Sequence, residues 1–114
     1  MNDINIDVTE SIKNELNTND VVLFMKGTPD FPMCGFSAAI VQVLKDIGVG
    51  FNSVNVLDND KMREGIKKYS NWPTIPQLYV KEEFVGGCDI VKEMYESGEL
   101  LELLNSRGIQ VSPS

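Results

Sequence analysis

Histidine is absent from this chain of 114 residues. Its absence excludes an acid–base mechanism that depends on an imidazole, and it excludes any metal site with histidine ligands. Only two cysteines are present, Cys34 and Cys88. Any thiol chemistry of this chain therefore involves one or both of these side chains.

Basic residues and long apolar runs are also scarce. The chain has 10 Lys and Arg residues against 17 Asp and Glu residues, for a net charge of −7. This balance opposes a nucleic-acid partner or an anionic membrane surface, because basic patches hold phosphate groups. No apolar run approaches the roughly 20 residues of a membrane span, and residues 1–15 do not resemble a signal peptide. We expect a cytoplasmic location, where cysteines are reduced thiols, metal ligands or transient redox groups.

Length and an apolar content of 42 % predict a single globular domain over residues 1–114. The continuous apolar run Val21–Met25 predicts a strand buried on both faces, and the spacing after it predicts a helix from Gly35 to Ile47. A strand at 51–56 would complete a parallel βαβ unit. The remaining patterns predict helices at about 8–17, 58–69, 89–96 and 100–105, and a hairpin of strands at 77–81 and 84–85. The predicted fold is α/β, a four-stranded mixed sheet with helices on both faces.

The segment Pro32–Ser37 stands between the first strand and the helix that follows it. Cys34 lies at the helix entrance, where backbone N–H groups and the helix dipole favour a thiolate. Redox proteins of the thioredoxin type carry Cys-X-X-Cys at this place, whereas Ser37 replaces the second cysteine here. A lone cysteine is more often a buried apolar filler. Three features favour a functional thiol instead: the preceding loop, the adjacent Gly35 and a serine hydroxyl that can donate to the sulfur. Without a resolving cysteine at position 37, such a thiol would bind a group through one sulfur.

Two prolines bracket Thr74 and Ile75 in the segment Trp72–Pro76 and restrict its backbone on both sides. One interpretation is a rigid connection between a helix and a strand. The other is a cis Ile75–Pro76 bond, which would turn the backbone of Ile75 outward. Its N–H and C=O could then pair with an extended peptide beside the thiol.

A second helix entrance follows at Gly86–Asp89. Glycine permits close approach of a ligand, and free N–H groups at a helix start can hold a carboxylate. Asp89 is either an N-cap or a contact for an ammonium group. Cys88 either packs under the sheet or acts as a late resolving thiol or ligand.

Two cationic side chains, Lys26 and Arg63, are candidates for a site near Cys34. Lys26 ends the first strand just before the Cys34 loop, which makes it a candidate partner for a thiolate or carboxylate, although a solvated lysine is the usual expectation. Arg63 lies on the third predicted helix, where a surface charge is the commoner role.

Four motifs together closely resemble the monothiol glutaredoxins of the CGFS type: Met25–Pro29, Cys34–Ser37, Trp72–Leu78 and Gly86–Ile90. The resemblance covers about residues 11–104, which would be the core of the domain. It implies a thioredoxin fold, in agreement with the predicted order of elements. It also implies that the protein binds glutathione and, as a homodimer, a 2Fe–2S cluster that it passes to other proteins.

The resemblance further implies a set of glutathione-binding residues: Lys26, Arg63, Ile75, Gly87, Cys88 and Asp89. The two cations would face the glycine carboxylate, and the backbone before a cis proline would pair with the cysteinyl unit. The start of the following helix would hold the γ-glutamyl end. Cys34 would be the catalytic thiol and the metal ligand. Ile75 stands where phenylalanine is common, a modest change because the backbone makes the contact.

Two functions fit this sequence. The leading hypothesis is a carrier of iron–sulfur clusters, because a 2Fe–2S cluster takes four thiolate-type ligands and one Cys34 from each chain of a dimer supplies two. Its partners would be apo iron–sulfur proteins, with BolA-like proteins suggested by the resemblance. The alternative is an oxidoreductase that removes glutathione from mixed disulfides through Cys34, since a second glutathione can attack the adduct.

Overall fold

The computed structural model describes residues 4–112. Its elements follow the predicted order, with a short 3-10 helix, η1, inserted before the third helix. They are α1 (Ile4–Thr18), β1 (Val21–Met25), α2 (Gly35–Ile47), β2 (Asn52–Asn55), η1 (Val56–Asp58), α3 (Asp60–Ser70), β3 (Gln77–Val80), β4 (Glu83–Gly86), α4 (Cys88–Ser97) and α5 (Glu99–Ser106).

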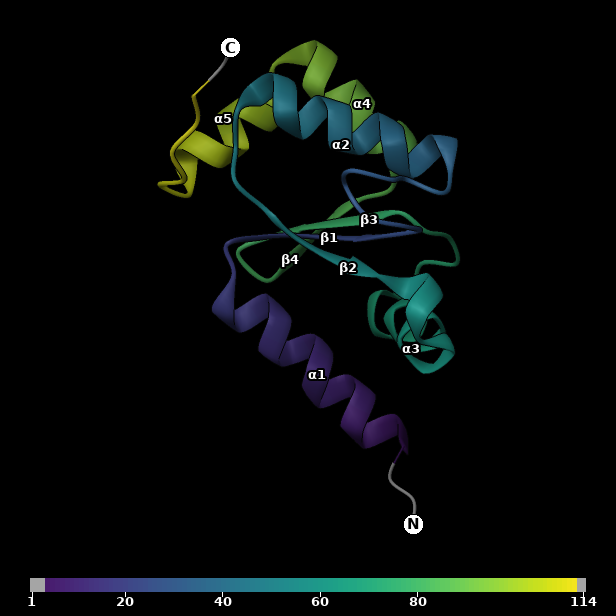
Figure 1. The fold of residues 1–114 in the computed structure, drawn as a ribbon. Helices are drawn as coiled ribbons and strands as arrows, with labels where there is room; N and C mark the ends of the chain where they lie inside the picture. The colour runs from purple at the N-terminus through teal and green to yellow at the C-terminus, as the bar shows by residue number, and fades with distance from the viewer. Residues whose placement is uncertain (1–3, 113–114) are drawn as a thin grey trace.

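The strands form one sheet in the order β2-β1-β3-β4. β1 pairs with β2 in parallel, whereas β1 with β3 and β3 with β4 are antiparallel. Helices cover both faces: α1 and α3 lie on one side, and α2, α4 and α5 on the other (Figure 1). The predicted α/β fold with a four-stranded mixed sheet is therefore confirmed.

β1 is buried along its whole length because it is central and both of its faces are covered. Leu23 and Met25 point into the core beneath α2, α4 and α5. Val22 and Phe24 point into the core beneath α1 and α3. Successive side chains of a strand face opposite sides, so a continuous apolar run supplies both cores at once.

α1 is longer than predicted. It begins at Ile4, so Val8, predicted as its first residue, lies in the second turn. Val8 is buried against Gly65 of α3, where an added Cβ would come within 2.2 Å of the Val8 side chain. Close packing at Val8 therefore holds the second turn of α1 against α3, and local patterns along the chain do not report such a contact. Within residues 4–112, no helix has the length and apolarity needed to cross a membrane.

The pairing of the strands brings several chain segments to one edge of the sheet. β4 runs in the same direction as β1, and β3 runs opposite to both. Three connections therefore meet at this edge: the one from β1 to α2, the one from β4 to α4 and the one that enters β3. The candidate functional residues lie on these three connections and on α3.

Candidate functional site

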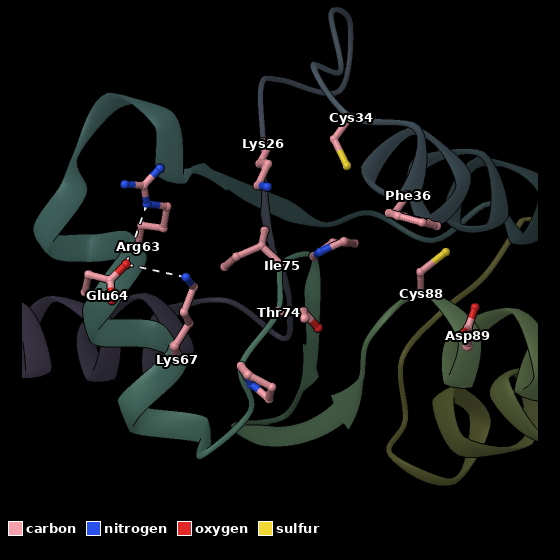
Figure 2. A pocket seen from close by; sticks show the side chains of 12 residues that line it. Lys26, Cys34, Phe36, Arg63, Glu64, Lys67, Thr74, Ile75, Cys88 and Asp89 are labelled. Carbon is pink, nitrogen blue, oxygen red and sulfur yellow. Dashed lines mark hydrogen bonds and ion pairs between the residues drawn. The ribbon is translucent and has the colours of Figure 1, made fainter.

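A cavity of about 550 Å³ opens between the starts of α2 and α4, the helix α3 and the chain that enters β3 (Figure 2). The predicted side chains that line it are Lys26, Cys34, Arg63, Ile75, Cys88 and Asp89. The remaining predicted residue, Gly87, is the N-cap of α4 and lies next to this lining. The structure therefore brings together residues that are widely separated in the sequence.

Cys34 is the N-cap of α2, as predicted, with an extended backbone (φ −156°, ψ 133°). Partial burial is the largest single influence on the pKa of its thiol and opposes ionisation, whereas the backbone N–H groups of Ser37 and Phe36 favour it. The Ser37 hydroxyl and the charge of Lys26 add to this effect. The pKa of Cys34 consequently lies below its ordinary value, because each of these groups stabilises the thiolate.

Ser37 interacts both with the Cys34 thiol and with the backbone at the end of β1. Its side chain is fully buried, and its Oγ accepts a hydrogen bond from the backbone N–H of Lys26 at 3.1 Å. The carbonyl of Lys26 accepts from the N–H of Met33 at 2.9 Å. The next N–H, that of Gly27, donates to Oδ1 of Asn55 at 2.9 Å. The backbone of Lys26 is thus held on both sides while its ammonium group faces the cavity.

The loop between β1 and α2 depends on Gly27, whose φ of +91° is a left-handed conformation. A Cβ there would lie 2.5 Å from the carbonyl oxygen of Phe31 and 2.6 Å from the nitrogen of Met33. The loop folds back closely over this residue and presents apolar side chains beside the thiol. Phe31, Met33 and Phe36 are 77 %, 69 % and 63 % exposed.

The Ile75–Pro76 peptide bond is cis, as predicted. The connection before β3 is held by hydrogen bonds to Gln77, a buried polar residue that was not selected from the sequence. Its Nε2 donates to the carbonyl oxygens of Trp72 at 3.2 Å and Thr74 at 3.1 Å. Its Oε1 accepts from the hydroxyl of Tyr79 at 3.3 Å. An amide side chain at the start of a buried strand was the available signal.

One end of the cavity is cationic. Arg63 of α3 points toward it, and Lys67 lies on the same face of that helix one turn later, because residues four apart are neighbours on a helix. Lys67 and Glu64 were not selected from the sequence. The four-residue spacing from Arg63 would have indicated Lys67, and Glu64 is then its neighbour three positions earlier on the helix. Phe36, which also lines the cavity, was likewise missed.

The other end of the cavity contains Cys88 and Asp89 at the start of α4 (Figure 2). Burial raises the pKa of Cys88, and the nearby charges of Asp89 and Cys34 raise it further against a smaller opposing effect of Lys92. Cys88 also packs against the core beneath α2 and α4. It is therefore both a packing residue and part of the cavity wall.

A metal centre built from this chain alone is not seen in residues 4–112. Within that range no three or more His, Cys, Asp or Glu side chains cluster so that they could hold a metal ion. Cys34 offers one thiolate-type ligand at the cavity mouth. The chain has two cysteines, so a cluster that needs four thiolate-type ligands would have to take at least two from outside the chain.

Comparison with known proteins identifies relatives over most of the chain. A model of the glutaredoxin family matches residues 21–85. The chain is 56 % identical over 93 residues to monothiol glutaredoxin-S14, a chloroplastic protein of Arabidopsis thaliana, with 82 % of this chain and 54 % of that protein covered. It is also 56 % identical over 95 residues to the probable monothiol glutaredoxin 2 of Rickettsia felis, covering 83 % of this chain and 91 % of the relative.

A solved structure agrees. The solution structure of a monomeric truncated mutant of Trypanosoma brucei 1-C-Grx1 matches with a TM-score of 0.84 at 43 % identity, over 92 % of this chain and 96 % of that one. The mixed sheet and a helix that opens on a cysteine define a protein of the thioredoxin fold. More narrowly, the chain belongs to the glutaredoxin family and to its monothiol members, with Ser37 in place of a second cysteine.

Proposed function

We propose that this protein binds glutathione in the cavity and that its homodimer carries a 2Fe–2S cluster to apo iron–sulfur proteins. The observation on which the proposal rests is the position of Cys34. Its thiol, whose pKa is lowered, lines a cavity with cations at one end and Asp89 at the other. Glutathione has complementary groups: carboxylates for the cations, an ammonium group for Asp89 and a central thiol beside Cys34.

Ligand number supports a shared cluster. A 2Fe–2S cluster takes four thiolate-type ligands. Two chains supply two through Cys34, and two bound glutathione molecules would supply the rest. The raised pKa of Cys88 makes it a poorer source of thiolate than Cys34. The apolar side chains of Phe31, Met33 and Phe36 are exposed, lie close to Cys34 in the sequence and would be covered when two chains meet across a cluster.

The test is reconstitution with iron and sulfide in the absence of oxygen, with and without glutathione. Visible absorbance measures the cluster, and gel filtration with mass determination measures the dimer. We expect a coloured dimer only when glutathione is present, and a colourless monomer once the cluster is removed. A stable coloured dimer formed without any small thiol would contradict the proposal and favour ligation by Cys34 and Cys88 from both chains.

A second candidate function has an observation in its favour, namely a cysteine with a lowered pKa and a serine, Ser37, where a resolving cysteine would stand. The Cys34 thiolate would attack the glutathione sulfur of a mixed disulfide and release the other protein as a thiolate. A second glutathione thiolate would then attack the adduct, giving glutathione disulfide and free Cys34. Fast deglutathionylation by a colourless monomer that forms no cluster would favour this enzyme over the carrier.

A further inference from the structure

Glu64 lies between the two cations that α3 contributes to the cavity. One of its oxygens, Oε2, is 3.8 Å from Nε of Arg63 and 3.4 Å from Nζ of Lys67 (Figure 2). The same three residues line the cavity. A carboxylate of the protein therefore already occupies the position between two cations at which the carboxylate of a ligand would bind.

The pairing leaves hydrogen-bond donors of Arg63 unused. Nε of Arg63 is buried and has no hydrogen-bond partner, because Glu64 is too distant to accept from it. Asp60 contacts the other side of the guanidinium, 3.3 Å from Nη2, but Asp60 does not line the cavity. A ligand carboxylate that enters would compete with Glu64 for Arg63 and Lys67 and would meet its negative charge at close range.

We propose that Glu64 is a specificity-determining residue, a tethered carboxylate that competes with the glycine carboxylate of glutathione for Arg63 and Lys67. The inference rests on the proposed function, because it concerns how the same cavity binds the same ligand. The side chain of Glu64 is 59 % exposed, so it can turn into solvent when the ligand binds. Glu64 thereby weakens binding at this end, which suits a carrier whose glutathione must leave when the cluster is passed on.

The direct test is Glu64→Gln, which keeps the shape of the side chain and removes its charge. Isothermal titration with glutathione at low ionic strength is expected to give a Kd about two- to fivefold lower than that of the unmodified protein, the range typical of exposed charge pairs. The gain should shrink as salt is added, since exposed charges are screened. Glutathione with its glycine carboxyl group amidated should show no gain, because it lacks the competing carboxylate.

Two further variants separate local competition from net charge. Glu102→Gln removes the same charge from an exposed position of α5, outside the cavity, and should leave the Kd for glutathione unchanged. Lys67→Gln should weaken binding, and adding Glu64→Gln to it should give a smaller gain than Glu64→Gln alone, because one of the two contested cations is missing.

The outcomes distinguish this inference from the proposed function. If the unmodified protein does not bind glutathione, the proposed function fails. If it binds and a folded Glu64→Gln protein binds with the same or lower affinity, Glu64 orders the cations instead of competing for them, and the inference is overturned. An equal gain in Glu102→Gln, or an equal gain with amidated glutathione, would also overturn it, because the effect would then be one of overall charge.

Discussion

Two helices of this protein begin at a cysteine on the wall of one cavity, yet the two thiols differ. Cys34 caps α2 and Cys88 is the first residue of α4. The pKa of Cys34 is lowered and that of Cys88 is raised. A helix start favours a thiolate in general, so its presence does not explain the difference.

The neighbouring groups explain it. Two backbone N–H groups and the Ser37 hydroxyl stabilise the Cys34 thiolate, the charge of Lys26 adds to them, and together these groups overcome the effect of burial on the pKa. At Cys88 burial is reinforced by the negative charge of Asp89. A helix start therefore lowers the pKa of a cysteine only where the hydrogen-bond donors and charges around the sulfur also stabilise the thiolate.

The largest expected effect separates the two cysteines by function. Cys34→Ser should abolish the visible absorbance of protein reconstituted with iron, sulfide and glutathione, because the proposed protein ligand is lost. Cys88→Ser should retain it. Circular dichroism of both variants controls for folding. A coloured Cys34→Ser protein beside a colourless Cys88→Ser protein would reverse the assignment of the ligand.

A smaller effect compares the glycines before the two cysteines. Gly27→Ala should lower the free energy of unfolding by at least about 1–2 kcal/mol, the cost of a left-handed backbone for a residue with a Cβ, and the overlap with the Phe31 carbonyl adds to it. Gly87→Ala should cost less, because its φ of −92° is ordinary and its new Cβ would lie 3.2 Å from Trp72 Nε1.

Urea denaturation of the two glycine variants measures this difference. Equal losses of stability would show that the Cys34 loop adapts to a side chain at Gly27. The Cys34 loop would then be less rigid than its backbone hydrogen bonds indicate.

The next prediction concerns the pH dependence of alkylation by iodoacetamide. The thiolate is the reacting form, so a lowered pKa moves the rise in rate to lower pH and a raised pKa moves it to higher pH. In single-thiol proteins, Cys34 should therefore react at lower pH than Cys88. Ser37→Ala should move the Cys34 profile to higher pH, and the unpaired N–H of Lys26 should cost roughly 1 kcal/mol of stability. Coincident profiles for the two cysteines would contradict the comparison.

The smallest expected effect is at the second helix start. Asp89→Asn removes a charge that raises the pKa of Cys88, so the alkylation profile of Cys88 should move to lower pH while that of Cys34 stays in place. The same change should cost about 0.3–1 kcal/mol of stability, because an acidic side chain in the first turn favours the helix dipole. An unmoved Cys88 profile would mean that burial alone sets its pKa.

The sequence by itself predicted the elements and several features of the site. The run Val21–Met25 predicted a strand buried on both faces, and the Pro32–Ser37 segment predicted a cysteine at a helix start, because both are local patterns. The prolines around Thr74 and Ile75 left a cis bond as one of two interpretations, the resemblance to monothiol glutaredoxins implied it, and the structure contains it. Such features depend on residues within a few positions of one another, so a linear pattern records them.

Only the tertiary structure decided which residues meet. Cys34 and Cys88 share a cavity because β1 and β4 run in the same direction and end at one edge of the sheet. The packing of α1 on α3 depends on the fit of Val8 against Gly65. The opposite pKa shifts of the two thiols, and the place of Glu64 between two cations, depend on distances across the fold. Burial and electrostatic interactions are set by neighbours in space, and local sequence patterns do not specify those neighbours.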